Sequence, residues 1–154
     1  MIVADILSLK GNALFTVSPD AMLSHGVITM DQHDIGSLVV MENGRLAGML
    51  SFREIIRVLA RRQHEHRSGP TKPVAEIVIR DVMDPDPLVV APSLDVNELR
   101  RVMLDTHTRY VPVMEGEVLM GVVSFHDVAR SVLDAQTFEN RMLKAYIRDW
   151  PEKE

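Results

Sequence analysis

One decapeptide occurs twice in this 154-residue chain, first as Gly48-Met49-Leu50-Ser51-Phe52-Arg53-Glu54-Ile55-Ile56-Arg57 and again as Gly121-Val122-Val123-Ser124-Phe125-His126-Asp127-Val128-Ala129-Arg130. The two occurrences are 73 positions apart, and the same shift superimposes Val17 on Val90, Pro19 on Pro92 and Val40 on Val113. Chance does not hold one register over such a span, so the chain is a tandem duplication with copies near residues 3–62 and 76–133.

Each copy begins with the same three predicted features. A leading segment (Val3–Leu7 or Ile79–Met83) is followed by a short strand, Leu14–Val17 or Leu88–Val90. An amphipathic helix comes next. In the second copy Ser93 is its expected N-cap, and its apolar stripe consists of Val96, Leu99, Val102 and Met103.

A hairpin and a second helix complete each copy. Two mostly apolar segments around a tight Gly-containing turn predict the hairpin, with strands at Ser37–Met41 and Leu46–Leu50 or at Tyr110–Met114 and Val118–Val123. Ser51 or Ser124 then opens a helix. The order predicts an α/β fold of two tandem β-α-β-β-α units. One unit is too small to bury its helices and sheet well, so the two are expected to pack together.

The duplication also sets the expected boundaries. The first domain covers residues 1–66, a polar linker rich in Gly and Pro covers 67–75, and the second domain covers 76–135. Helical spacing of apolar residues continues after the second copy as far as Pro151, which predicts a C-terminal helix and tail over residues 136–154.

Composition excludes several classes of function. With 46% hydrophobic residues the chain can bury a core, and with no cysteine it has no disulfide, thiolate metal site or cysteine nucleophile. The net charge of -5 disfavours nucleic-acid binding. The N-terminus lacks a signal-peptide pattern, and no apolar run reaches the roughly 18 residues of a membrane span. We therefore expect a soluble cytoplasmic protein. It contains no nucleophile–base pair, metal cluster or Walker loop, so we expect no enzyme.

The repeated unit resembles a known family at three points. Each copy opens with Asp5-Ile6-Leu7 or Asp81-Val82-Met83, continues through Ile35–Val40 or Thr108–Val113, and closes with Gly-hydrophobic-hydrophobic-Ser-x-x-acid. These motifs resemble the CBS (cystathionine-β-synthase-type) domain, and the whole chain resembles the small stand-alone bacterial proteins that carry a tandem pair. The resemblance implies pseudo-two-fold packing and a non-catalytic energy or redox sensor. Its regulatory ligand would be an adenine nucleotide (AMP, ADP, ATP or NAD(H)), with no metal.

The resemblance also implies two ligand clefts between the copies. In each, the acidic residue would hold the ribose hydroxyls, the nearby serine would face phosphate, and a strand of the other copy would read the adenine. The first cleft would use Lys10, Phe15, Ile35, Gly36, Ser37, Ser124, His126 and Asp127. The second would use Ser51, Arg53, Glu54, Met83, Leu88, Thr108, Arg109 and Tyr110.

Simpler explanations exist for the same residues. Ser51-x-x-Glu54 and Ser124-x-x-Asp127 are also the pattern of a capping box, which satisfies a helix N-terminus without any ligand. Glu54 departs from the Asp that is usual in the family, which favours unequal occupancy of the two clefts. His64 and His66 lie in the linker region with no acidic or thiolate residues at fixed geometry, which disfavours a metal site. A cluster of arginines forms either a solvated helix face or a contact for a phosphate tail: Arg57, Arg61, Arg62 and Arg67.

Two expectations concern partners. Many apolar helical faces in a short chain predict a homodimer formed through the helices of both copies and the C-terminal helix. The sequence does not name the regulated protein. The alternative to a nucleotide sensor is a dimeric interaction scaffold whose clefts are vestigial.

Overall fold

The computed structural model describes residues 1–11, 14–65, 73 and 76–149, so the linker predicted at 67–75 lies outside the described residues except for Pro73. In chain order the elements are the helix α1 (Val3–Lys10), the strand β1 (Thr16–Val17), the helix α2 (Leu23–His33), the strands β2 (Ser37–Glu42) and β3 (Arg45–Ser51), the helix α3 (Phe52–Glu65), the 3₁₀ turn η2 (Ile79–Asp81), the helix α4 (Val96–Thr106), the strands β4 (Tyr110–Glu115) and β5 (Val118–Ser124), and the helix α5 (Phe125–Arg148). Both hairpins and both helices of each copy are confirmed.

The two hairpins repeat each other in detail. β2 pairs with β3 and β4 with β5, both antiparallel, and each hairpin has a register shift at the equivalent place, between Val40 and Met41 or between Val113 and Met114. In the first hairpin Asn43 and Gly44 both have positive φ, which the tight turn requires. The same bulge in both copies shows that the duplication extends to backbone geometry.

The short strands before the hairpins are weaker than predicted. β1 covers only Thr16–Val17 of the predicted Leu14–Val17, and it pairs parallel with β2. The strand predicted at Leu88–Val90 is reduced to an isolated parallel bridge between Val90 and Val113. Each segment lies at the edge of its sheet, so it has a single neighbouring strand with which to pair.

The predicted N-cap of α4 is wrong by two positions. Asp95, not Ser93, precedes the helix, and its carboxylate accepts hydrogen bonds from the backbone of Asn97 and Glu98. Ser93 lies in the preceding turn, where the Leu94 N–H donates to the carbonyl of Ala91. Asp is as good an N-cap as Ser, so composition alone does not choose between them. The predicted apolar stripe is otherwise confirmed, with Val96, Leu99 and Met103 buried.

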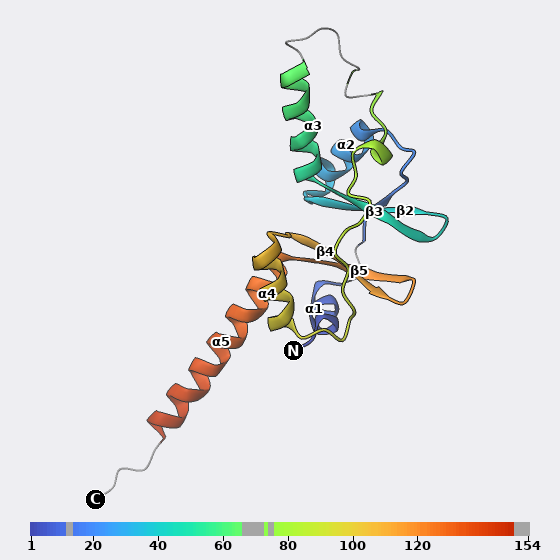
Figure 1. Cartoon of the computed structure of the whole chain (residues 1–154). Helices are drawn as coiled ribbons and strands as arrows, with labels where there is room; N and C mark the ends of the chain where they lie inside the picture. The colour runs from blue at the N-terminus through green and yellow to red at the C-terminus, as the bar shows by residue number, and fades with distance from the viewer. Residues whose placement is uncertain (12–13, 66–72, 74–75, 150–154) are drawn as a thin grey trace, which may run out of the picture.

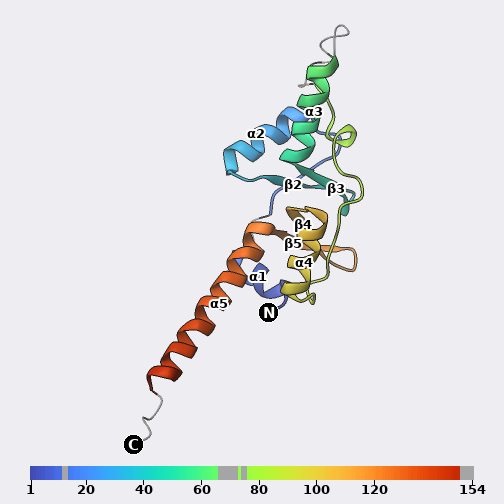
Figure 2. The ribbon, with the colours of Figure 1, turned by 60° about the vertical axis from the view of Figure 1, so that its left-hand side comes forward.

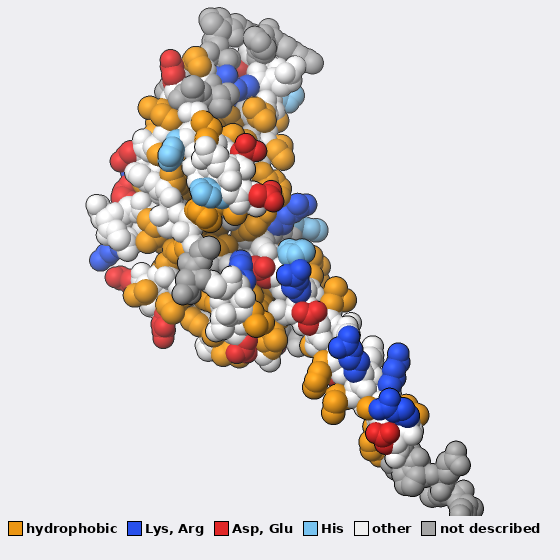
Figure 3. Space-filling model, turned by 180° about the vertical axis from the view of Figure 1, so that it is seen from behind, with side chains coloured by type: hydrophobic (Ala, Val, Ile, Leu, Met, Phe, Trp, Pro, Cys, Tyr) orange, Lys and Arg blue, Asp and Glu red, His pale blue; other side chains and the backbone are white. Residues whose placement is uncertain are grey.

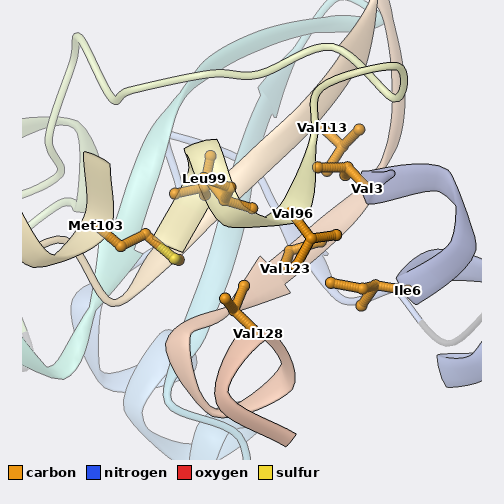
Figure 4. Close-up of a cluster of buried hydrophobic side chains, with 9 residues drawn as sticks. Val3, Ile6, Val96, Leu99, Met103, Val113, Val123 and Val128 are labelled. Atoms are coloured by element: carbon orange, nitrogen blue, oxygen red, sulfur yellow. The ribbon is translucent and has the colours of Figure 1, made fainter. Parts of the chain in front are cut away.

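Each hydrophobic core combines residues of both copies. Val3 and Ile6 of α1 are buried in the core of the second copy, beside Val96, Val123 and Val128, as Figure 4 shows. Ile79, which precedes the second copy, is buried in the core of the first. The leading segments are therefore exchanged. Matching backbone hydrogen bonds fix them, from Val3 N–H to the Leu94 carbonyl and from Ile79 N–H to the Ala21 carbonyl, each 2.9 Å long.

The two units are related by a pseudo-two-fold axis between their sheets. Figures 1 and 2 show the hairpins β2–β3 and β4–β5 facing one another at the centre, with α2 and α3 on one outer side and α1, α4 and α5 on the other. Equivalent hydrogen bonds flank the axis, from Phe52 N–H to the Gly36 carbonyl (3.1 Å) and from Phe125 N–H to the Arg109 carbonyl (2.8 Å). α5 has 24 residues against 14 in α3 and projects beyond the body. Among the described residues, no helix has the length and apolar character needed to cross a bilayer.

Candidate functional site

Ser124 and Asp127 form a complete capping box at the start of α5. The Ser124 hydroxyl accepts from the Asp127 N–H at 3.1 Å, and the Asp127 carboxylate accepts from the Ser124 N–H at 2.8 Å. The capping box that the sequence offered as the alternative for these residues is thus present. The capping box does not engage both carboxylate oxygens. Among the described residues, the contacts of the carboxylate reach only Oδ2. The side chain is 18% exposed, so the carboxylate is not sealed from solvent.

Lys10, at the end of α1, brings a positive charge to the same carboxylate. Its Nζ lies 2.7 Å from Asp127 Oδ2 and donates to the Val122 carbonyl at 2.9 Å. Burial would raise the pKa of Asp127, but the hydrogen bonds from Lys10 and from the Ser124 backbone, with the Lys10 charge, outweigh it and hold the pKa below its ordinary value. The carboxylate is therefore ionised at neutral pH. The exchange of the leading segments is what places Lys10 here.

Gly36 and Tyr110, predicted for different clefts, touch across the pseudo-two-fold axis. A Cβ added at Gly36 would lie 2.0 Å from the Tyr110 hydroxyl and 3.0 Å from the Phe52 ring. Tyr110 and Phe52 pack edge to face, with ring centroids 5.9 Å apart. The Arg109 guanidinium lies 5.5 Å from the centre of the Phe52 ring, within cation–π range. Residues assigned to two sites therefore form one continuous cluster.

Tyr110 links this cluster to the acidic group. Burial of the ring raises the pKa of Tyr110, the Arg109 charge lowers it, and the Asp127 carboxylate raises it further, with a net shift above the ordinary value. The phenol is thus neutral at physiological pH and carries a proton that it can donate. Asp127 thus lies within electrostatic reach of Tyr110.

The equivalent acid of the first copy has a different environment. Glu54 is buried, with 9% of its surface exposed, and accepts hydrogen bonds from both the backbone and the hydroxyl of Ser51. No described cation pairs with it. The neighbouring Arg53 is exposed, and its N–H donates to the Ser51 hydroxyl at 3.3 Å. In both copies one carboxylate oxygen accepts two contacts, but Glu54 is buried and Asp127 is paired with Lys10, so the two predicted sites are not equivalent.

The other predicted residues are scattered around these two helix starts. Phe15 stacks on His33 at 4.2 Å and Ile35 packs against the first core. Ser37 pairs with Ser51 in the β2–β3 register. Met83 lies against the backbone of Gly48. The hydroxyl of Thr108 bonds to that of Thr106, whereas Leu88 and His126 are exposed.

Sequence reasoning missed Phe52 and His33. Phe52 contacts Gly36, Tyr110 and Arg109, and the available signal was its recurrence as Phe125 in the repeated decapeptide. His33 has no such counterpart in the duplication. Its stacking on Phe15 depends on how α2 ends.

The structure records a cavity of about 300 Å³ away from the predicted residues. It lies between the N-terminus, α4 and α5 and is lined by Met1, Val96, Asn97, Arg100, Ser131, Val132, Ala135, Gln136 and Glu139. None of the predicted nucleotide-binding residues lines it. Within the described part of the chain, no three His, Asp or Glu side chains gather closely enough to hold a metal ion, and His66 lies outside that part.

Comparison with known proteins identifies the duplicated unit. The family model described as CBS domain matches residues 3–61 and 79–134. The chain is 28% identical over 154 residues to the mitochondrial CBS domain-containing protein CBSX3 of Arabidopsis thaliana, covering 95% of this chain and 71% of that one. It is 30% identical over 115 residues to the CBS domain-containing protein YhcV of Bacillus subtilis, covering 74% and 75%.

Solved structures agree with the fold. A CBS-domain protein of Agrobacterium tumefaciens superimposes with a TM-score of 0.74 at 25% identity, over 85% of this chain and 98% of that one. CBSX2, solved in complex with AMP, gives 0.69 at 21% identity, over 88% and 98%. The CBS pair of protein MJ0100, solved with 5′-methylthioadenosine and S-adenosylmethionine, gives 0.72 at 18% identity, over 88% and 98%. The repeats, the exchanged leading segments and these matches lead to one conclusion: the chain belongs to the CBS-domain family and carries two copies of the domain.

Proposed function

We propose that the chain is a non-catalytic regulatory module that binds an adenine nucleotide beside Asp127. The observation that carries the proposal is the partly exposed Asp127 carboxylate, which is ionised and held by Lys10, and whose contacts with the described residues use only Oδ2. A carboxylate of this kind accepts hydrogen bonds from both hydroxyls of a ribose. Ser124 and the N-terminus of α5 lie next to it and favour a phosphate.

The ligand class follows from the same charges. Lysine has three donor hydrogens, and two of those on Lys10 are directed at Val122 and Asp127. Within the described part of the chain no acceptor is recorded for the third, which leaves it for an anionic ligand. A phosphorylated adenosine compound, such as AMP, ADP, ATP or NAD(H), fits this environment better than a neutral or cationic one. Two CBS proteins of similar fold, solved with AMP and with adenosine-derived ligands, support the adenosine part of the assignment.

We place the principal site in the second copy's helix start and a weaker one at Ser51, Arg53 and Glu54. Burial of Glu54 behind its cap supports this order. Binding would shift the relative position of the two copies, because Tyr110, which lies within electrostatic reach of Asp127, also contacts Gly36 and Phe52 of the first copy. Such a shift would report energy or redox state to a regulated protein.

A second candidate function is an interaction scaffold with vestigial clefts. The specific observation in its favour is that both acidic residues already have internal partners, Lys10 for Asp127 and Ser51 for Glu54. In either case we propose a homodimer. The exposed apolar residues available for its interface lie on all four larger helices, among them Ile28 on α2, Ile56 and Leu59 on α3, Leu104 on α4 and Leu133 on α5.

The test is a thermal-shift panel on ligand-stripped protein with AMP, ADP, ATP, NAD⁺, NADH and S-adenosylmethionine. A ligand at about 100 times its dissociation constant stabilises the folded state by roughly 2.7 kcal/mol, which raises the melting temperature visibly. Asp127→Asn should abolish the shift, whereas the matched Glu54→Gln variant should keep most of it. A wild-type protein that responds to none of the six compounds would favour the scaffold.

A further inference from the structure

The cavity of about 300 Å³ takes no part in the function proposed above, yet three separate segments build its walls. These segments are Met1, the first turns of α4 and the inner half of α5. The cavity lies at the root of α5, before the helix projects from the body as Figures 1 and 3 show. Its volume is at the lower end of the range for ligand pockets, so it suits a molecule smaller than a nucleotide.

Backbone hydrogen bonds and core packing hold these walls in place. The Val96 N–H, at the start of α4, donates to the Met1 carbonyl at 3.1 Å, and Ile2 forms a β-bridge with Asp95. On the α5 side, Val128 is buried in the same core as Val96, as Figure 4 shows. The cavity therefore lies between fixed elements of the fold.

A buried hydroxyl in this cavity has no partner among the described residues. Ser131 lines the cavity and is only 8% exposed. A serine within a helix can donate to the carbonyl four residues earlier, but no hydrogen bond joins Ser131 Oγ to any described residue. A polar group at this depth is costly to leave unpaired. A molecule that enters the cavity would satisfy it.

Two opposite charges line the same cavity without meeting. Arg100 lies on the α4 wall and Glu139 on the α5 wall, and both are exposed. They form no ion pair with each other, and within the described part of the chain no other residue pairs with either. By contrast Arg101, the next residue of α4, pairs with Glu98 at 3.2 Å. The cavity thus keeps a cation and an anion apart.

Apolar and amide groups complete the lining. Val96, Val132 and Ala135 supply hydrocarbon to the wall. Asn97 and Gln136 add amide groups, which both donate and accept hydrogen bonds. The lining therefore combines hydrocarbon, neutral polar groups and one charge of each sign, as a small amphipathic ligand requires.

These groups restrict the chemistry of an occupant. A simple anion suits Arg100 but is repelled by Glu139, and a simple cation has the reverse problem. A wholly apolar molecule leaves the Ser131 hydroxyl unpaired. We propose that the cavity binds a small zwitterion of the amino-acid class, with its carboxylate on Arg100, its ammonium group on Glu139 and its carbon chain against the apolar wall. The planar guanidinium fork of arginine matches a carboxylate. This inference goes beyond nucleotide binding and does not depend on it.

Methyl NMR of the whole chain, stripped of ligand, tests the proposal, with Val96, Val132 and Ala135 as reporters in the cavity wall. The probes are the straight-chain amino acids glycine, β-alanine, γ-aminobutyrate and δ-aminovalerate, whose charged ends are increasingly far apart. At least one should shift these methyl signals with a dissociation constant below about 1 mM. Valerate and butylamine each replace one charged end of γ-aminobutyrate by a methyl group. Each should bind at least about 10-fold more weakly than the best zwitterion.

Variants of the two charged residues identify the contacts. Arg100→Gln and Glu139→Gln should each weaken binding of the best zwitterion by about 10-fold, and Ser131→Ala by about 3-fold. Arg101→Gln is the matched control on α4 and should leave the affinity unchanged, because Arg101 does not line the cavity. Arg100→Glu combined with Glu139→Arg should restore part of the affinity, because a zwitterion can bind in the reverse direction.

Other results would overturn the proposal. No methyl shift with any amino acid at about 10 mM would mean that the cavity holds water only. Equal affinity for valerate and γ-aminobutyrate would make it a site for simple anions. Methyl shifts that follow protein concentration without any ligand would mean that a second copy of the chain covers the cavity. None of these results bears on the nucleotide site, which is tested separately through Asp127.

Discussion

The ammonium group of Lys10, in the last turn of α1, lies 2.7 Å from Oδ2 of Asp127, in the first turn of α5. The two residues are 117 positions apart in the chain, and only the exchange of the leading segments brings them together. The pair connects the segment that precedes the first copy to the acid of the second. It therefore couples the stability of the module to the charge of its candidate ligand site.

This pair should give the protein a defined acid sensitivity. The pKa of Asp127 is lower in the folded chain than in the unfolded chain, so its ionised form stabilises the fold at neutral pH and the contribution is lost as pH falls through the folded-state pKa. Because Lys10 is partly exposed, we expect no more than about 1 kcal/mol. Urea unfolding of wild type and Asp127→Asn should differ by a constant amount above about pH 5 and converge below about pH 4.

Asp105→Asn is the control for that titration. Asp105 is exposed on α4, and no described cation pairs with it, so its difference from wild type should stay small across the same range. A difference for Asp127→Asn that grows on acidification would contradict the direction of the pKa shift.

Lys10→Met should separate phosphate recognition from adenosine recognition. The variant keeps the length and packing of the side chain but removes a donor and its charge, so the affinity for AMP should fall about 10-fold while the affinity for adenosine changes little. Isothermal titration with both ligands measures the two effects. An increase in AMP affinity would mean that Lys10 competes with the ligand for Asp127. An equal loss for both ligands would give Lys10 only a structural role.

Gly36→Ala should disrupt the contact between the copies. The new Cβ would lie 2.0 Å from the Tyr110 hydroxyl, so the tyrosine ring must move, at a cost of about 1–3 kcal/mol. The same substitution in a Tyr110→Leu background should cost less, because the tyrosine clash is gone and only the tight contact with the Phe52 ring remains. Chemical unfolding of the four proteins gives a double-mutant cycle with a coupling of at least about 1 kcal/mol. Additive effects would show that the ring and Gly36 are not in contact.

The tandem fold could be predicted from the repeat because hairpins and amphipathic helices are local features. Asn43 and Gly44 indicate their own turn, and Ser124 indicates the helix that follows it. The N-cap of α4 was misplaced because Ser93 and Asp95 satisfy the same local requirement. The short strand near Val90 pairs with a strand in another part of the chain, so its length cannot be predicted from its own residues.

The candidate site could be predicted only in part, for a similar reason. The Ser124–Asp127 pair follows from local spacing, but its contact with Lys10 depends on which core the leading segment enters. Nothing in the sequence of α1 shows that Val3 and Ile6 are buried in the second copy. Gly36 and Tyr110 were likewise assigned to separate clefts, although they meet at the axis.

The exchange of leading segments predicts which half of the protein each segment stabilises. Ile6 and Ile79 are both almost fully buried, so Ile6→Ala and Ile79→Ala should each cost about 2–5 kcal/mol. Native-state hydrogen exchange should locate the damage: Ile6→Ala should speed exchange in β4 and β5, and Ile79→Ala in β2 and β3. Each variant is the control for the other. If Ile6→Ala instead loosened β2 and β3, the leading segment would belong to its own copy. The Lys10–Asp127 contact, which depends on the exchange, would then have to be abandoned as well.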